Sequence, residues 1–483
     1  MTDREAVIGL ECHVELSTRT KMFCGCSNAF GAAPNANTCP VCLGHPGTLP
    51  VPNEQAIVSI TTIGLALDSE IAPRSEFARK NYFYPDMPKN FQISQYDLPT
   101  CVGGHLDIDV DGDTRRIGIT RVHMEEDTGK TTHAGTTGRI SEAEYALIDY
   151  NRAGVPLVEC VSEPDMRTAG EAGAYLRTLR STLESLGVSD VRMEEGSLRC
   201  DANVSVRERG VDAFGTKVEI KNMNSVRSLE RAIRFEIDRQ NTLLDAGQSI
   251  VQETRHWNED EGTTHSMRSK EEAFDYRYFP EPDIPPLRPD RAWIEQVRTS
   301  LPELPAARRA RYERELALNE EPARLLASSR ELGAFFEEAV QLGAAPIAAA
   351  NWLTQDLAGT LNKAGVTLAD AKITPQHIAD VVQLVDEGTV SSAGAKQIVE
   401  AAVATGDRAQ DIVVRMGLTQ VSDEGALGGV IDEVITENAE AADRFRGGNE
   451  GTLGFLVGQV MKKTGGSANP KLAGDLLRSR LSS

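Results

Sequence analysis

Four cysteines near the beginning of the sequence have the spacing of a metal site. They form two close pairs, Cys24-x-Cys26 and Cys39-x-x-Cys42, with twelve residues between the pairs. Two pairs of thiolates joined by a loop can surround one Zn²⁺ ion with four sulfur ligands in a tetrahedron. We therefore expect a structural zinc knuckle over residues 24–42. Four buried free thiols are the less favoured alternative. A zinc-dependent hydrolase is also disfavoured, because its metal would need an open coordination position.

Acidic residues and histidines lie on segments that alternate as β-strands do. Over residues 8–16, Glu11 and His13 point away from the apolar positions, because successive side chains of a strand face opposite sides. Residues 198–206 alternate in the same way, and Asp201 lies on their polar face. These patterns predict an antiparallel sheet that carries charged groups on one side.

A second acidic group follows a predicted hairpin. Asp111-Gly112 supplies a tight turn, and the returning strand ends in His123-Met124-Glu125-Glu126-Asp127. Carboxylates that lie together repel one another and need a compensating cation, and hard oxygen ligands suit Mg²⁺. Mg²⁺ is also the ion that neutralises the phosphates of ATP during phosphoryl transfer. The alternative is a set of surface acids that pair with Arg121 and Lys130.

Motifs for other kinds of ATP site, or for glutamine hydrolysis, are missing from the sequence. Thr128-Gly129-Lys130-Thr131 resembles the end of a phosphate-binding loop, but Met124 stands where the first glycine of that loop belongs. The sequence has no G-x-S-x-G elbow and no Ser-Ser-Lys amidase signature. We therefore do not expect this chain to release ammonia from glutamine by itself.

The elements that must position these residues divide by composition. Strand patterns dominate the first part of the chain, and seven prolines between residues 280 and 305 then indicate a linker. The remainder is Ala-rich and helical, with a helix start at Thr374-Pro375 and a break near Gly406-Asp407. We predict an α+β fold in three domains. They are a domain built on antiparallel sheet over residues 1–290, an all-helical domain over 291–406 and a small helical tail domain over 407–483.

The charge of the chain is unevenly distributed. The net charge is −21, which argues against nonspecific binding of nucleic acid. Residues 444–483, however, carry seven basic residues against two acidic ones. Such a tail can hold a polyanion locally, although a solvated helical face would have the same composition. No apolar stretch is long enough to cross a bilayer, and the first residues resemble neither a signal nor a transit peptide. We expect a cytoplasmic protein without a membrane partner.

Several longer motifs together resemble the B subunits of the tRNA-dependent amidotransferases, a family that also includes the archaeal E subunit. They follow one another in order along nearly the whole chain. They are residues 7–16 (Val-Ile-Gly-Leu-Glu-Cys-His-Val-Glu-Leu), 79–86, 92–95, 123–127, 149–157, 193–203, 275–283 and 454–470. The resemblance implies a cradle-shaped, kinase-like first domain, followed by a helical domain and a small tail domain.

The resemblance also implies an activity. ATP would phosphorylate the side-chain carboxylate of Glu on tRNA(Gln), or of Asp on tRNA(Asn), and ammonia would displace the phosphate. Such an enzyme is a carbon–nitrogen ligase with glutamine as its amido donor. A glutaminase, the A subunit of the family's complexes, would supply the ammonia. A small C subunit would join the A and B subunits, which gives a heterotrimer. ATP, Mg²⁺ and a structural Zn²⁺ are the expected cofactors.

Motif position suggests roles for individual residues. The residues that would hold Mg²⁺ are Glu11, His13, Glu125, Glu126 and Asp201. Those that would contact phosphate or substrate are Lys80, Arg152 and Lys221, and those that would contact tRNA are Lys462, Lys463 and Lys471. The alternative function is a noncatalytic tRNA-binding scaffold, which is disfavoured because acid clusters without metal would repel RNA. If the chain is catalytic, Glu126→Gln should abolish phosphorylation of the aminoacyl-tRNA while glutamine hydrolysis persists.

Overall fold

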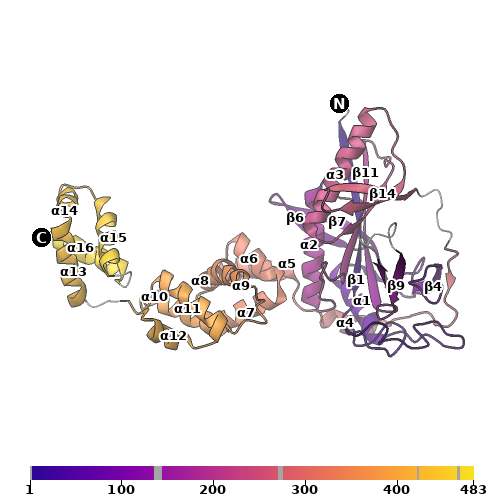
Figure 1. Ribbon diagram of the computed structural model, residues 1–483, viewed down its shortest axis with the longest axis horizontal. Coiled ribbons are helices and arrows are strands. Elements are labelled where there is room, and N and C mark those ends of the chain that lie inside the picture. The colour runs from indigo at the N-terminus through magenta and orange to yellow at the C-terminus, as the bar shows by residue number, and fades with distance from the viewer. Residues whose placement is uncertain (1–2, 135–143, 270–275, 421–423, 465–467, 483) are drawn as a thin grey trace. The chain divides into compact units, whose positions relative to one another are not determined.

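The chain folds into two compact units, residues 1–304 and 305–483. The computed structural model describes residues 3–134, 144–269, 276–420, 424–464 and 468–482. The strands lie in the first unit, together with a few helices, and the second unit is helical (Figure 1). Strands and helices are thus largely segregated along the chain, and the predicted α+β class is confirmed.

The first unit is built on one large sheet. All neighbouring strands of the sheet are antiparallel except β12 and β13, so the sheet is mixed rather than purely antiparallel. The main path runs β14 (Thr263–Ser269), β13 (Glu253–Asn258), β12 (Val218–Met223), β11 (Leu198–Glu208), β1 (Arg4–Glu15), β10 (Pro156–Ser162), β7 (Asp113–Glu126), β4 (Phe91–Ser94), β3 (Ala78–Asn81) and β15 (Phe279–Pro280). β1 therefore lies between strands that are distant in sequence.

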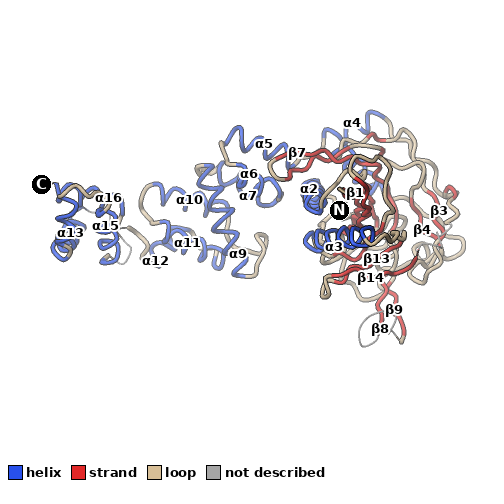
Figure 2. Tube along the Cα trace, turned by 90° about the horizontal axis from the view of Figure 1, so that it is seen from above, coloured by secondary structure: helices blue, strands red, loops and turns tan. Residues whose placement is uncertain are grey.

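Shorter strands extend this sheet around β7. β6 (His105–Val110) forms the predicted hairpin with β7, and Asp111 and Gly112 have φ angles of 54° and 86°. Positive φ at both central residues is what a tight two-residue hairpin turn requires. β5 (Cys101–Val102) also pairs with β7, and β2 (Glu70–Ile71) pairs with β5. A separate hairpin joins β8 (Lys130–Ala134) to β9 (Tyr145–Asp149) and is visible at the edge of the unit in Figure 2.

The core of the first unit lies on one face of this sheet. Ile8, Leu10, Cys12 and Val14 alternate along β1 and are buried in the same apolar cluster as side chains of α2 (Ala169–Leu186) and α3 (Val226–Asp245). Figure 1 shows both helices running along the sheet. Ser225 is the N-cap of α3 and accepts a hydrogen bond from Ser228 N at 3.0 Å. Because the apolar residues face these helices, Glu11 and His13 face the other side.

Two further helices complete the first unit. α1 (Glu54–Ala66) begins at Asn53, whose side chain accepts a hydrogen bond from Ala56 N, and its apolar side chains join the core. α4 (Arg291–Thr299) packs against α1. The compact unit therefore extends to Leu304, beyond the predicted division at residue 290.

The second unit contains two apolar cores. The first core belongs to α5 (Pro305–Leu316), α6 (Glu320–Ser328), α7 (Arg330–Gln341), α8 (Pro346–Asn351), η2 (Trp352–Leu357), α9 (Ala358–Ala364), α10 (Pro375–Asp386), α11 (Ser392–Thr405) and α12 (Ala409–Met416). The second core belongs to α13 (Glu424–Glu437), α14 (Ala439–Arg446), α15 (Thr452–Lys463) and α16 (Pro470–Ser482). Ala409 and Ile412 of α12 are fully buried in the first core, which therefore extends beyond the predicted division at residue 406.

The predicted helix start at Thr374-Pro375 is confirmed. Thr374 caps α10 in a capping box with His377, and Pro375 occupies the first turn. Within the described residues, no helix combines the length and the apolar character needed to span a membrane.

Candidate functional site

Three residues form a straight row across the polar face of the sheet. His13 on β1 lies directly opposite Glu159 on β10, and Glu159 lies directly opposite His123 on β7. Glu159 Oε2 is 3.5 Å from His13 Nε2 and 3.3 Å from His123 Nε2. Because residues in register on one face of a sheet are neighbours, the strand pairing itself brings these side chains together.

Glu125 adds a second carboxylate to this row. It lies two residues after His123 on β7, on the same face, and its carboxylate is 3.8 Å from His13 Nε2. Ligand atoms of His13, Glu125 and Glu159 all lie within 4.8 Å of one another. We call these three residues the His13 cluster. Two carboxylates and an imidazole at this separation can hold one divalent cation.

The charges of the His13 cluster depend on one another. Burial lowers the pKa of His13, but the hydrogen bond to Glu159 and the charges of Glu159 and Glu125 raise it to about 9. Burial raises the pKa of Glu159, but His13 and His123 more than offset this, and the pKa lies below its ordinary value. Burial lowers the pKa of His123 to about 4. Burial and the charge of Glu159 raise the pKa of Glu125. The positive charge of protonated His13 thus compensates the negative charge of ionised Glu159. A bound metal ion could compensate this charge instead.

A cavity of about 260 Å³ opens beside the cluster. Its lining combines the acidic groups with two cations, Lys80 from β3 and Arg199 from β11. The Lys80 ammonium lies 4.9 Å from the centre of the Tyr276 ring, which also lines the cavity. Burial lowers the pKa of Lys80, but the charge of Glu125 raises it above its usual value. The cavity therefore places two positively charged side chains next to an acidic cluster that could hold a cation.

Asp127 joins two arginines at the end of the cavity. Arg199 Nη2 donates to Asp127 Oδ2 at 2.7 Å, and Arg152 Nε lies 3.6 Å from the same oxygen. Burial raises the pKa of Asp127, but the charges of Arg199 and Arg152 lower it below its usual value. Burial and the charge of the neighbouring Asp127 raise the pKa of Glu15 to about 8.

Glu11 and Asp201 form a second acidic pair one row away. They lie directly opposite each other on β1 and β11. Glu11 Oε1 accepts a hydrogen bond from Asn203 at 2.9 Å, and Asp201 pairs with Lys221 of β12. Lys221 also lies 3.2 Å from Glu219. Asp201 lines the 260 Å³ cavity, so this pair lies close to the His13 cluster.

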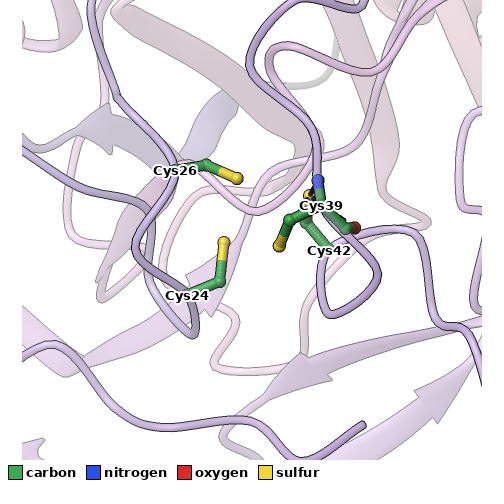
Figure 3. Close-up of side chains that lie close together, drawn as sticks. All are labelled: Cys24, Cys26, Cys39 and Cys42. Atoms are coloured by element: carbon green, nitrogen blue, oxygen red, sulfur yellow. Dashed lines mark hydrogen bonds between the residues drawn. The ribbon is translucent and has the colours of Figure 1, made fainter.

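The four predicted zinc ligands converge. The sulfur atoms of Cys24, Cys26, Cys39 and Cys42 lie within 4.8 Å of one another, and Figure 3 shows all four cysteines around a common space. Zn–S bonds of about 2.3 Å would place sulfurs of a tetrahedron about 3.8 Å apart, and the Cys39–Cys42 separation is 3.9 Å. A hydrogen bond from Cys24 lowers the pKa of Cys42 to about 4. Lys21, fully buried, donates to Cys42 Sγ at 3.8 Å and to Tyr150 O at 3.0 Å. The four thiols fit a tetrahedral metal ion.

The loop between the two cysteine pairs forms hydrogen bonds with the segment that immediately precedes Arg152. Asn35 N donates to the side chain of Asp149 at 2.9 Å, and Tyr150 N donates to the Asn35 side chain at 2.8 Å. Asn37 N donates to Asn151 Oδ1 at 2.7 Å. The cysteine loop therefore fixes the residues that immediately precede Arg152 in the chain.

Glu126 lies apart from the His13 cluster. It follows Glu125 on β7, so the two side chains face opposite sides of the strand. Its carboxylate pairs with Lys89 and accepts a hydrogen bond from Ile93 N at 2.9 Å. It lines a different cavity, of about 270 Å³, together with Lys21, Arg79, Lys89 and Glu281. The structure therefore does not bring Glu126 together with His13, and its assignment as a Mg²⁺ ligand stays a prediction.

Two family models match the sequence. One, described as the GatB/GatE catalytic domain, matches residues 6–295, and another, described as a GatB domain, matches residues 334–481. The chain belongs to the GatB/GatE family. The family that the motifs indicated is thereby confirmed.

Relatives of this GatB/GatE chain are similar over their whole length. Each of the following is named as the B subunit of an aspartyl/glutamyl-tRNA(Asn/Gln) amidotransferase. The protein of Carboxydothermus hydrogenoformans is 51% identical over 481 residues, which cover 100% of this chain and 99% of the relative. That of Brevibacillus brevis is 50% identical over 483 residues, all of both chains. That of Thermobifida fusca is 51% identical and covers 99% of this chain and 94% of the relative. The chain is thus an amidotransferase-family protein, a component of a carbon–nitrogen ligase.

The sequence analysis did not identify two residues of the site in this GatB/GatE chain, and it named a third residue without assigning it a role. Glu159 and Arg199 were not predicted, and His123 was seen only as part of a motif. Glu159 did leave a signal, because it is the single charged residue in the strand PLVECVS. Arg199 was visible in the alternation of residues 198–206, but its proximity to His13 depends on the pairing of β1 with β11.

Proposed function

We propose that this chain uses ATP to phosphorylate the side-chain carboxylate of Glu or Asp carried on a tRNA, as the first step of its amidation. The observation that carries the proposal is the His13 cluster, which opens onto a cavity that also contains Lys80 and Arg199. The substrates, misacylated tRNA(Gln) and tRNA(Asn), come from the names of the relatives.

The His13 cluster fits a divalent cation by its chemistry. Glu125 and Glu159 offer oxygen ligands, which suit both Mg²⁺ and Mn²⁺, and His13 would add an imidazole nitrogen. When bound, Mg²⁺ would neutralise negative charge on the phosphates of ATP. Glu11 and Asp201, one row away on the same face, would serve a second ion or hold the first.

The chemistry needs positioning more than covalent participation by the protein. One oxygen of the substrate carboxylate attacks the γ-phosphorus, the bond to the β,γ-bridging oxygen breaks and ADP leaves. The product is an acyl phosphate, whose phosphate is a good leaving group when ammonia attacks the carbonyl carbon. Water would also hydrolyse it, so the reaction needs a sheltered site. Glu125, which lines the cavity, is buried, and so is the nearby His123, so this side of the cavity is shielded from water.

Ammonia would come from another protein of the complex. The sequence contains no amidase signature, and the relatives' name designates one part of a larger assembly. We propose a heterotrimer with a glutaminase, the A subunit, and a small C subunit. The first unit, with its polar sheet face and cavity, would be the cradle-like kinase domain. The helical domain and the tail domain would follow it.

The zinc knuckle would support this site rather than take part in the reaction. Four thiols leave no open coordination position, and the loop between the cysteine pairs holds residues 149–151. Arg152 follows directly and donates to the carbonyl oxygens of Thr128 and Gly129 at 3.0 and 3.1 Å. The metal would therefore stabilise the backbone around Asp127.

The decisive experiment separates phosphorylation from ammonia production. The complex of this chain with its partner subunits is given aminoacyl-tRNA, ATP and an ammonium salt, and ADP formation that depends on the aminoacyl-tRNA is measured. Glu159→Gln should lower this rate by about 100-fold or more, because it removes a carboxylate of the His13 cluster, which would hold the cation that neutralises the phosphates.

A matched control keeps the result specific. Glu208→Gln removes an exposed carboxylate at the far end of β11 and should leave the rate unchanged. If the Glu159→Gln complex forms ADP and amidated tRNA at the normal rate, this chain is a noncatalytic scaffold and the proposal is wrong.

A further inference from the structure

Arg199 occupies a special position beside the His13 cluster. It lies directly opposite His13 in the pairing of β1 with β11, so that Arg199, His13, Glu159 and His123 form one row across four strands. The row thus begins with a guanidinium next to the imidazole of the cation-binding cluster. Arg199 also lines the 260 Å³ cavity.

Much of the guanidinium is still available for a ligand. Nη2 donates to Asp127, but among the described residues neither Nε nor Nη1 has a hydrogen-bonding partner. The side chain is 33% exposed, whereas Asp127 is only 6% exposed. Asp127 can therefore fix the position of the guanidinium through Nη2, while Nε and Nη1 remain able to donate to a ligand. An arginine held in this way is suited to an oxyanion with several oxygen atoms.

A second cation lies on the other side of the cluster. In the sheet order β11-β1-β10-β7-β4-β3, Arg199 belongs to the first of these strands and Lys80 to the last. Both side chains line the same cavity, and the strands that carry the His13 cluster lie between their two strands. A ligand that contacts Arg199, Lys80 and a metal ion on the His13 cluster must carry negative charge on several atoms. A phosphoryl group in transfer meets this requirement.

We propose that Arg199 is a catalytic residue that donates hydrogen bonds to the oxygens of the phosphoryl group as it passes from ATP to the substrate carboxylate. This rests on the proposed function. No bond to Arg199 forms or breaks. Its fixed positive charge stabilises the equatorial oxygens while the carboxylate oxygen bonds to phosphorus and ADP departs.

The test compares Arg199→Met, Arg199→Lys and a control on the same strand. Arg207 also forms an ion pair, with Glu5 at 2.8 Å, but near the opposite end of β11. In the intact complex with ammonium as nitrogen source, Arg199→Met should lower kcat for aminoacyl-tRNA-dependent ADP formation by about 100-fold or more. The KM for ATP should change by less than about fivefold. Arg199→Lys should recover part of kcat, and Arg207→Met should behave as the unsubstituted protein.

Mn²⁺ binding distinguishes a catalytic role from a structural one. Because Asp127 keeps Arg152 as a partner, Arg199→Met should bind Mn²⁺ at the His13 cluster with normal affinity and unfold at a normal temperature. Loss of Mn²⁺ binding together with kcat, or no recovery with lysine, would overturn the proposal in favour of a structural role. A raised KM for aminoacyl-tRNA with unchanged kcat would overturn it too.

The failure of the proposed function would look different. In that case the unsubstituted complex itself would form no ADP that depends on aminoacyl-tRNA, and both assignments would fall together. If the unsubstituted complex is active and Arg199→Met retains its kcat within threefold, only the role of Arg199 is refuted.

Discussion

Glu159 lies directly across from His13 in the pairing of β10 with β1, and Glu159 Oε2 is 3.5 Å from His13 Nε2. The same carboxylate oxygen approaches His123 at 3.3 Å from the next strand. One acid therefore connects two histidines from the two neighbouring strands. Without Glu159 the His13 cluster would consist of one carboxylate and one imidazole.

The first prediction uses the neighbours Glu125 and Glu126 as a matched pair. Glu125→Gln should weaken Mn²⁺ binding to the chain by at least about tenfold, because it removes a ligand atom from the His13 cluster. Glu126→Gln should leave this affinity unchanged, because its carboxylate faces Lys89 in the other cavity. Titration of both variants with Mn²⁺, followed by electron paramagnetic resonance, measures the difference. Equal losses in the two variants would show that Glu126 belongs to the cation site.

The sequence predicted the local elements well because their signals are local. The alternation along β1, the turn at Asp111-Gly112 and the helix start at Thr374-Pro375 depend on neighbouring residues alone, and all three are confirmed. The convergence of the four cysteines could be inferred from their spacing, since ligands this close in sequence need only a short loop to meet.

The composition of the His13 cluster could not be predicted in the same way. Glu159 and Arg199 reach His13 only because β1 pairs with β10 on one side and β11 on the other, and these strands are more than a hundred residues away in sequence. The side of the strand that Glu126 faces could not be predicted for a related reason. Two adjacent acids on a strand cannot both face one site, and nothing in the pattern Glu125-Glu126-Asp127 says which one does.

The second prediction concerns the cysteine site. Cys39→Ser should lower the zinc content well below that of the unsubstituted protein and lower the unfolding midpoint of the first unit by about 5 °C or more. It should also slow ADP formation, since the cysteine loop holds the residues before Arg152. Cys101→Ser, which changes a thiol outside the cluster, should keep its zinc. Elemental analysis and thermal unfolding test this, and full zinc binding by Cys39→Ser would contradict the four-thiolate site.

The third prediction concerns a buried carboxylate that ties α3 to the edge of the sheet. Glu236 has no exposed surface, accepts a hydrogen bond from Arg239 of the same helix at 2.7 Å and lies 3.7 Å from Arg255 of β13. Glu236→Ala should lower the free energy of unfolding by about 3 kcal/mol, because it leaves partly buried arginines without their partner. The exposed pair Arg234–Glu230 is the control, and Arg234→Ala should cost less than about 1 kcal/mol. Denaturant titrations of the two variants should therefore separate clearly, and similar midpoints would contradict the assigned role of Glu236.

The fourth prediction distinguishes among the three lysines proposed to contact tRNA. Lys463 lies 2.7 Å from both Glu433 and Glu437, so its charge is largely compensated within the tail, whereas the exposed Lys462 and Lys471 form no ion pair among the described residues. Lys462→Ala and Lys471→Ala should each weaken tRNA binding and reduce the slope of log K against log salt by about 0.7–0.9, the value for one lost phosphate contact. Lys463→Ala should change the slope by much less, because an ammonium held by two carboxylates displaces few counterions from RNA. Binding titrations of the full complex over a range of salt concentrations measure all three slopes. If Lys463→Ala produced the largest change, its two glutamates must release it on binding, and the compensation seen in the free chain would not decide which lysine contacts the RNA.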